Sequence, residues 1–304
     1  MSARGQKALP LQLVISDSSS FLGTGMTLKF ELEEDEKKAF FYGKKIGDVI
    51  DGSLIGFAGY TFKITGGSDI AGFPHIKGVP GPGLKQIMRS GPPGYRPRKY
   101  KIPKKGGGYK IINLKNVRKK KTVRGEELSE WTRQVNLAIL ERSGANIKEM
   151  SENELANDKI LKGIAEKLGK VILKWGFEGI TFIGEGESTP LIEKFKELGL
   201  DDSAIGKIYF KVGVAVLKNF EKDELKKLLE PLKKLSRKKP PKLGRYIAAV
   251  IYTAYEELKE KGNANPDELG EKLANEIVTA MRKSLEGNLE KPKKVPFKIK
   301  EGGE

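Results

Sequence analysis

The chain has 304 residues and a formal net charge of +17, with no cysteine and a single histidine. This length favours two domains over one, and the missing cysteines exclude a disulfide scaffold, a cysteine nucleophile and thiolate metal sites. One histidine argues against a histidine metal cluster or a serine–histidine triad, and no apolar run reaches the roughly 20 residues of a membrane helix. We therefore expect a soluble intracellular protein with no membrane partner, no cofactor and no metal site, whose composition leaves few routes to catalysis.

The first half of the chain shows the two-residue period of β-strands. Leu11, Leu13 and Ile15 alternate with their neighbours, and residues 26–32 and 134–140 alternate in the same way. Residues 54–65 predict another strand, in which Gly56 and Gly59 indicate a bulge or a barrel corner. Several short strands separated by glycine-rich turns favour a small all-β barrel or a sandwich.

The basic segment, residues 63–125, carries 17 basic side chains and one acid, Asp69. These uncompensated charges repel one another and destabilise a compact state unless a polyanion neutralises them. Nucleic-acid phosphate is the favoured partner, because its binding is driven by counterion release and because the segment lacks the amphipathic helix typical of membrane surfaces. Prolines and glycines between residues 78 and 108 predict an extended basic loop without long regular elements.

After about residue 148 the apolar residues follow the 3.6-residue period of helices. Ser151 and Glu154 have the spacing of a capping box, and Asn265 followed by Pro266 predicts the start of the last helix. We expect helices at 151–175, 190–199, 204–219, 222–235, 243–258 and 265–287. The resulting prediction is an α+β multidomain fold with a β-barrel RNA-binding domain (1–147), an all-α helical domain (148–287) and a basic tail (288–304).

Three motifs stand out in the first half of the chain. They are Ile-Thr-Gly-Gly-Ser-Asp at 64–69 with Gly-Phe-Pro at 72–74, the proline-rich run at 90–98, and Arg-Lys-Lys-Lys-Thr-Val-Arg-Gly at 118–125. In this order, and from about Leu11 to Leu140, the chain resembles small-subunit ribosomal protein six of the archaeal and eukaryotic type. The resemblance implies a β-barrel that binds ribosomal RNA of the small subunit, beside neighbouring ribosomal proteins in the cytoplasmic ribosome, and that has no enzymatic activity.

The same motifs have a direct physical interpretation. Gly66 and Gly67 allow either a hairpin turn, which we favour, or a close approach of phosphate to backbone amides. Tyr95 either stacks on an unpaired base or packs back onto the barrel. The candidate RNA-binding residues are the cations and one tyrosine of the second and third motifs and their surroundings: Arg89, Tyr95, Arg96, Arg98, Lys99, Lys101, Lys104, Lys105, Arg118, Lys119, Lys120, Lys121 and Arg124.

Some residues depart from the family or suggest other chemistry. His75 stands where the family pattern has methionine, and we expect a surface or turn histidine. The stretch 99–119 is longer than the archaeal pattern, which indicates an inserted hairpin or an RNA-contacting loop. The glycine-rich stretch 184–188 lacks the lysine of a phosphate-binding loop and is interpreted as a plain loop. Trp131 and Trp175 are expected to be packing residues.

The helical half of the chain resembles no family that we identify. Its charge is nearly balanced, with 31 basic against 27 acidic residues in 148–304, which argues against RNA as its main partner. Two alternatives to a ribosomal protein stay open. One is an RNA-modifying enzyme with its activity in the helical half, and the other is a non-ribosomal RNA-binding adaptor that recruits a partner protein through the face of Tyr246 and Tyr255.

Overall fold

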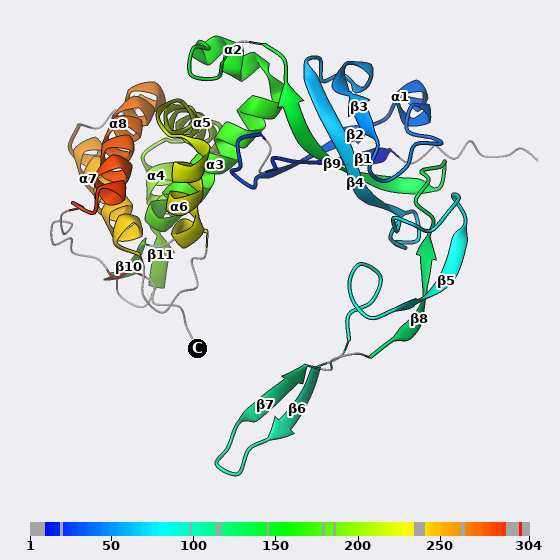
Figure 1. The fold of residues 1–304 in the computed structure, drawn as a ribbon. Helices are drawn as coiled ribbons and strands as arrows, with labels where there is room; N and C mark the ends of the chain where they lie inside the picture. The colour runs from blue at the N-terminus through cyan, green and yellow to red at the C-terminus, as the bar shows by residue number, and fades with distance from the viewer. Residues whose placement is uncertain are drawn as a thin grey trace, which may run out of the picture. The chain divides into compact units, whose positions relative to one another are not determined.

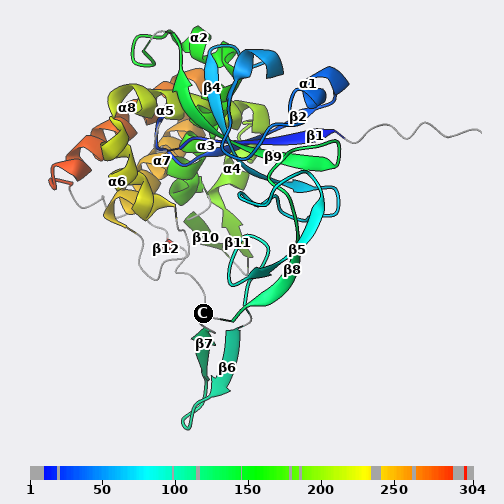
Figure 2. The same cartoon turned by 45° about the vertical axis from the view of Figure 1, so that its right-hand side comes forward.

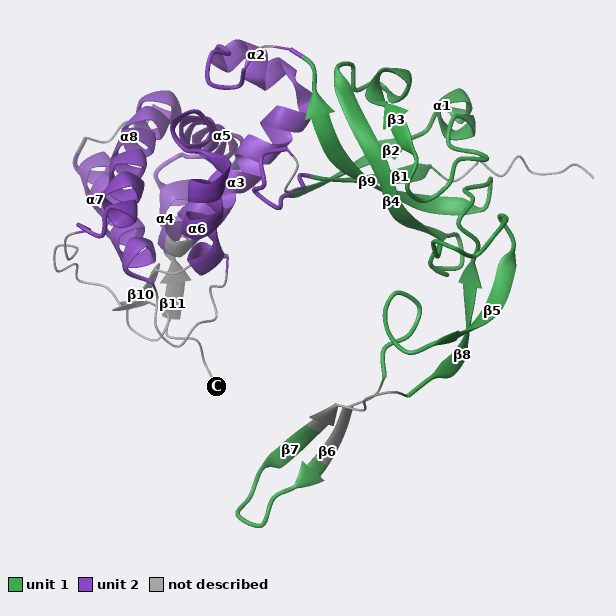
Figure 3. Cartoon of the chain, viewed as in Figure 1, with its two compact units in different colours: residues 1–16, 27–143 green, residues 17–26, 144–304 purple. Residues whose placement is uncertain are grey.

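The computed structural model describes residues 10–18, 21–97, 99–113, 117–144, 146–177, 180–184, 187–233, 241–261, 265–289 and 298–299. Contacts divide the chain into two compact units (Figure 3). Unit 1 consists of residues 1–16 and 27–143, and unit 2 consists of residues 17–26 and 144–304. Within the described residues, no helix has the length and apolar character required to cross a membrane.

Unit 1 is built on a five-stranded mixed sheet in the order β2-β1-β9-β4-β3 (Figure 1). Its strands are β1 (Leu11–Ser16), β2 (Thr27–Leu32), β3 (Val49–Asp51), β4 (Tyr60–Asp69) and β9 (Thr132–Arg142). β1 and β9 are parallel, and the other neighbours are antiparallel. The predicted alternation is confirmed in β1, where every second residue is buried, so one face of this strand contributes to the core.

The α+β class is confirmed, but the described strands do not close into a barrel. β2 and β3 each pair on one side only, so they are the edges of an open sheet among the residues described. The strand predicted over 54–65 begins later, at Tyr60, after the short 3-10 helix η1 (Gly52–Ile55). Gly56 and Gly59 precede β4 with φ of +89° and +81°. They therefore form turns, which glycine adopts without steric cost, and not a bulge inside a strand.

The predicted hairpin turn at Gly66 and Gly67 is wrong, because both glycines lie inside β4. A Cβ on Gly67 would lie 2.5 Å from the carbonyl oxygen of Gln134 in β9. The register of β4 against β9 shifts between Ile64 and Gly66. Glycine is thus needed here because the two strand backbones approach closely. Close approach of another backbone is one of the usual reasons for glycine inside a strand.

Two antiparallel ladders replace the extended loop predicted for residues 78–108, and the second ladder confirms the hairpin that was one of the alternatives for residues 99–119. β5 (Leu84–Arg89) pairs with β8 (Lys119–Arg124), and β6 (Lys99–Pro103) pairs with β7 (Tyr109–Asn113). Figures 1 and 2 both draw the β6–β7 hairpin at the end of the β5–β8 ladder. Proline has no backbone N–H to donate to a ladder, so it is tolerated outside paired strands and at their ends. Pro92, Pro93 and Pro97 lie between β5 and β6, and Pro103 is the last residue of β6.

Unit 2 contains the predicted helices, and its first predicted helix is divided at Asp158. The helices are α2 (Glu152–Asn157), α3 (Lys159–Phe177), α4 (Leu191–Glu197), α5 (Asp202–Asn219), α6 (Lys222–Leu232), α7 (Lys242–Lys261) and α8 (Pro266–Leu285). Ser151 and Glu154 form both hydrogen bonds of the predicted capping box, and Asn265 caps α8. Residues 17–26 belong to this unit, and Lys233 Nζ donates to the carbonyl oxygen of Thr24 over 3.0 Å.

Helices α3 and α5 cross at unusually short range because of two glycines. A Cβ on Gly169 of α3 would lie 1.9 Å from the carbonyl oxygen of Tyr209, and a Cβ on Gly213 of α5 would lie 1.9 Å from that of Ala165. Any side chain at either position would therefore force the two backbones apart. This crossing fixes α3 and α5 in the core of the unit, where Ile164, Leu168, Ile208 and Val212 are buried.

The second half is not all-α as predicted, because it also contains a three-stranded sheet in the order β11-β10-β12. β10 (Ile180–Gly184) and β11 (Glu187–Pro190) pair antiparallel, so Gly184, Glu187 and Ser188 of the stretch expected to be a plain loop lie in strands. β12 (Lys298–Ile299) lies inside the predicted basic tail and pairs with β10. Strands of this length contain too few residues for a two-residue period to be read from sequence.

Candidate nucleic-acid interface

The β5–β8 ladder is joined to the sheet by a buried ion pair. Arg124 Nε donates to Asp69 Oδ2 over 2.9 Å, and its Nη1 donates to the carbonyl oxygen of Pro82 over 3.0 Å. Asp69 Oδ1 also accepts from the backbone N–H of Phe73 over 2.7 Å. The side chains of Arg124 and Asp69 are 10% and 2% exposed. Unlike the candidates whose side chains the structure describes elsewhere, Arg124 thus faces the protein interior, because its charge is compensated by the only acid of the basic segment.

His75 lies in the same junction and is buried, so the expected surface or turn histidine is wrong. Its Nδ1 lies 2.6 Å from the carbonyl oxygen of Gly125, and its Nε2 lies 3.1 Å from Thr132 Oγ1. A carbonyl oxygen only accepts, so Nδ1 carries the proton and Nε2 accepts from the hydroxyl. Burial lowers the pKa of His75 below its usual value, and the positive charge of Arg124 lowers it further, while the Gly125 and Asp69 oxygens oppose the shift. The neutral imidazole is therefore a structural link in this junction.

Cations lie on both faces of the β5–β8 ladder. Lys121 pairs with Ile87 on the face that packs against the small apolar cluster of Ile76, Val79 and Val123. Lys120 pairs with Met88 on the opposite face, because successive side chains of a strand alternate. Among the candidates here, Arg118, Lys119 and Lys120 are exposed and Lys121 and Arg89 are half-buried. A ladder with charge on both faces suits surroundings of opposite charge better than it suits a protein core.

The β6–β7 hairpin continues this basic surface. Lys104 and Lys105 lie at its turn and are exposed, as is Lys110 of β7, which the sequence interpretation did not include. Position within the basic segment is the only sequence signal that would have pointed to Lys110. Tyr109 is 67% exposed. The backbones of Lys99 and Lys101 lie in β6, and Arg98 lies outside the described residues.

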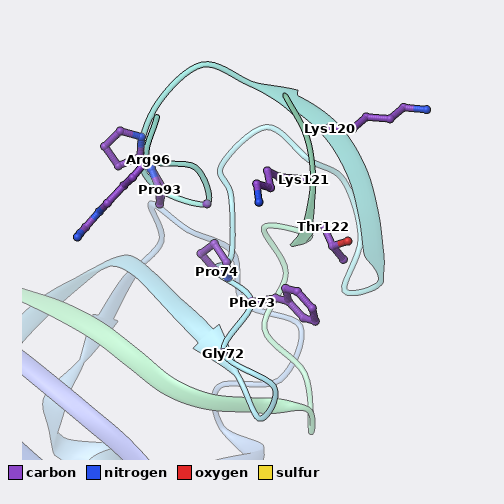
Figure 4. A pocket seen from close by; sticks show the side chains of 10 residues that line it. Gly72, Phe73, Pro74, Pro93, Arg96, Lys120, Lys121 and Thr122 are labelled. Atoms are coloured by element: carbon purple, nitrogen blue, oxygen red, sulfur yellow. The ribbon is translucent and has the colours of Figure 1, made fainter. Parts of the chain in front are cut away.

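A pocket of about 670 Å³ opens where the proline-rich run meets β8 and the turn after β4. Figure 4 shows Lys121 above Pro74 and Phe73, with the run of Pro93 and Arg96 on another side. The side chains of Lys120 and Arg96 both point away from Lys121. The sequence interpretation did not predict this pocket, because it joins three segments that are far apart in the chain. Its lining residues are Gly72, Phe73, Pro74, Pro92, Pro93, Gly94, Arg96, Lys120, Lys121 and Thr122.

The sequence left open whether Tyr95 stacks on an unpaired base or packs back onto the protein. Its arrangement in the structure lies between these two alternatives. Its side chain is half-buried, and Lys121 Nζ lies over its ring, 5.7 Å from the centroid. A cation at this distance is attracted by the ring quadrupole. Tyr95 therefore orients one of the candidate cations.

Trp131 and Tyr255 also differ from their sequence interpretations. Trp131 is 55% exposed and is therefore not the packing residue expected; the side chain of Trp175 lies outside the described ones. Tyr255 packs edge-on against Phe195, with ring centroids 5.5 Å apart, and Tyr246 is half-buried. In the described part of the helical half, Leu285 is the only exposed large apolar side chain, so this part offers no broad apolar face at the two tyrosines.

Comparison with known proteins identifies the family of the first half. Residues 11–152 match the family model of ribosomal protein S6e. The chain is 37% identical over 153 residues to the small ribosomal subunit protein eS6 of Nanoarchaeum equitans, an alignment that covers 50% of this chain and 98% of that protein. The chain belongs to the ribosomal protein S6e family.

Two further S6e relatives match a similar length of this chain. The eS6 protein of Pyrobaculum arsenaticum is 39% identical over 134 residues, which cover 42% of this chain and 77% of the relative. That of Methanothermobacter thermautotrophicus is 33% identical over 142 residues, which cover 47% of this chain and 95% of the relative. The resemblance drawn from the sequence motifs is confirmed. The family match ends at residue 152, so helices α3 to α8 lie outside it.

Proposed function

We propose that the chain is a structural constituent of the small ribosomal subunit and binds ribosomal RNA through the basic segment. The single observation that carries this proposal is charge: residues 70–125 contain sixteen Lys and Arg and no acid. Arg124 is compensated by Asp69, whereas the cations of the β5–β8 ladder lie on both of its faces and Lys104, Lys105 and Lys110 of the β6–β7 hairpin are exposed. Membership of the S6e family supports RNA of the small subunit as the polyanion.

The proposed contact is electrostatic and positional, and it involves no bond-making step. The exposed cations Arg118, Lys119, Lys120, Lys104 and Lys105 would neutralise backbone phosphates and release counterions. Lys99, Lys101, Arg96, Arg98 and Lys121 complete the set as proposed contacts. Arg124 would act indirectly, since it holds β8 in place for the other residues.

We also propose a division of labour along the chain. Residues 1–147 would attach the protein to the RNA, beside neighbouring ribosomal proteins in the cytoplasm. Residues 148–287 would be an accessory helical domain that meets a protein partner, and residues 288–304 a basic tail. The relative from Nanoarchaeum equitans supports this division, because the alignment covers 98% of that protein while leaving half of this chain unmatched.

Sedimentation of the tagged full-length chain from a native lysate on a sucrose gradient tests the proposal. A chain ending at Ser143 is run beside it, and both are washed with high salt. If both chains travel with the small subunit, the first half suffices for attachment and the helices are an accessory. If the full-length chain stays at the top of the gradient, the proposal is overturned, and a free RNA-binding adaptor becomes the better description.

A further inference from the structure

The pocket beside β8 supports an inference that rests on the proposed RNA binding and makes it more specific. We propose that this pocket holds one unpaired nucleotide of the RNA. Its base would lie against Phe73 and Pro74, and its phosphate would lie beside Lys121. The ligand class is thus a nucleotide turned out of a stem, in addition to the backbone phosphates that we propose as ligands of the rest of the basic surface.

The apolar side of the pocket is suited to a base. Phe73 and Pro74 form its floor, and Pro92 and Pro93 contribute a second wall. Phe73 is half-buried, so part of its ring is presented to the pocket. Aromatic side chains bind the faces of unpaired bases by stacking, and this mode tolerates any base because every base has a π-face.

The cationic side is suited to the phosphate of the same nucleotide. Lys121 extends toward the space above Pro74 in Figure 4, with its ammonium group close to the ring of Tyr95. Among the described residues, neither Lys121 nor Arg96 forms an ion pair with an acid. Lys121 is therefore available to the phosphate of the bound nucleotide. Arg96 points away from Lys121 in Figure 4 and would instead contact the phosphate of a neighbouring nucleotide, to which a guanidinium can donate two hydrogen bonds.

The two sides are held in place before any ligand arrives. The N–H of Phe73 donates to Asp69, and Arg89 Nε donates to the carbonyl oxygen of Pro93 over 3.2 Å. Gly94 has φ of +92°, and a Cβ there would lie 3.3 Å from Val123 Cγ1. The turn of the proline-rich run thus packs closely against β8. A preformed site loses little conformational entropy on binding.

The combination of an apolar floor and a cationic rim distinguishes a nucleotide from simpler anions. An inorganic phosphate would use the cations and leave Phe73 and the prolines in water. A continuous RNA duplex would present phosphates but keep its bases stacked inside, away from the floor. An unpaired nucleotide matches both sides at once.

The test compares two stem-loop RNAs that differ in one base. The first contains a single unpaired adenosine bulge, and the second has an abasic nucleotide at the same place, so the number of phosphates is equal. Binding to the full-length protein is measured by fluorescence anisotropy. We expect the bulged RNA to bind roughly tenfold more tightly, which is the scale of one base–aromatic stack. Phe73→Leu should remove this preference, whereas Lys119→Ala, outside the pocket, should weaken both RNAs equally.

Each outcome separates this inference from the proposed function. If both RNAs bind equally and their affinity falls with salt, the basic segment binds RNA but the pocket proposal is overturned. If neither RNA binds, the proposed function fails as well. If adenosine 5′-monophosphate alone binds as tightly as the bulged RNA, the pocket is a free-nucleotide site and the proposal is wrong. The comparison of the two RNAs on the unmodified protein decides the matter even if Phe73→Leu does not fold.

Discussion

Arg124 and Asp69 form a buried ion pair, 2.9 Å between Nε and Oδ2, at the point where the basic ladder joins the sheet. The pair links the end of β8 to the end of β4, which are 55 residues apart in the chain. Removing one partner of a buried pair leaves the other charge uncompensated and is far more costly than losing a surface pair.

The variant Asp69→Asn should therefore loosen unit 1. We expect the free energy of opening of β4 and β9 to fall by about 3 kcal/mol. Native-state hydrogen exchange of peptides from these two strands measures it without interference from unit 2. The matched control is Glu34→Gln, which breaks the surface pair with Lys37 and should leave the exchange unchanged. Unaltered exchange in Asp69→Asn would show that the pair does not hold the junction.

The pH dependence of unit 1 should follow His75. Because the pKa of the folded state is lowered, the unfolded chain takes up a proton first as pH falls through about 6.5. The contribution of His75 to the free energy of unfolding is thus fully present above that pH. It decreases below that pH until the pKa of the folded state is reached. His75→Met should make the melting temperature of unit 1 less dependent on pH between pH 7 and pH 5.

The same residue offers a direct measurement. His75 is the only histidine of the chain, so its imidazole proton signal in NMR needs no assignment. We expect a titration midpoint below 6.5. A midpoint at or above that value would contradict the buried, neutral imidazole.

The charge of β8 should set the salt dependence of RNA binding. Replacing Arg118, Lys119, Lys120 and Lys121 by alanine removes up to four phosphate contacts, so the slope of log K against log salt concentration should become shallower by about 3. Filter binding of a stem-loop RNA at several salt concentrations measures the slope. As a control for net charge, alanine at the exposed Lys162, Lys226, Lys227 and Lys283 of unit 2 should leave the slope nearly unchanged. Equal slopes in the two variants would refute this placement of the interface.

Two glycines of α5 should respond in opposite ways to the same substitution. Gly213→Ala places a methyl group against the carbonyl of Ala165 and should lower the stability of unit 2 by about 1–3 kcal/mol through overpacking. Gly206→Ala meets nothing within 4 Å and should raise it by up to about 1 kcal/mol through helix propensity. Thermal unfolding followed by circular dichroism at the helical band compares them. A stabilised Gly213→Ala would mean that the α3–α5 crossing is looser than described.

Patterns that depend on neighbours in sequence could be predicted. The stripe of Leu243, Ile247, Ile251 and Ala254 predicted α7, because a helix brings residues three and four apart onto one face. Basic composition likewise predicted exposed cations in this part of the chain, but not the β5–β8 and β6–β7 ladders in which many of them lie.

Features that depend on distant partners could not be predicted. His75 is buried by contacts with Gly125 and Thr132, which lie 50 and 57 residues away. In sequence, a glycine pair such as Gly66-Gly67 looks the same whether it forms a turn or lies in a strand that a second strand approaches closely. The pocket needs Phe73 and Lys121 to be brought together, and neither residue signals this alone.

The pairing of β12 with β10 has a practical consequence for shortened versions of the protein. β10 lies between β11 and β12, so a chain cut after residue 289 would lose one neighbour of β10 and leave its backbone N–H and C=O groups exposed on that side. Exposed strand edges recruit strands of other molecules. β12 thus covers Ile180 and Thr181 at this edge, and a version of the protein without it should form dimers or larger species as its concentration rises.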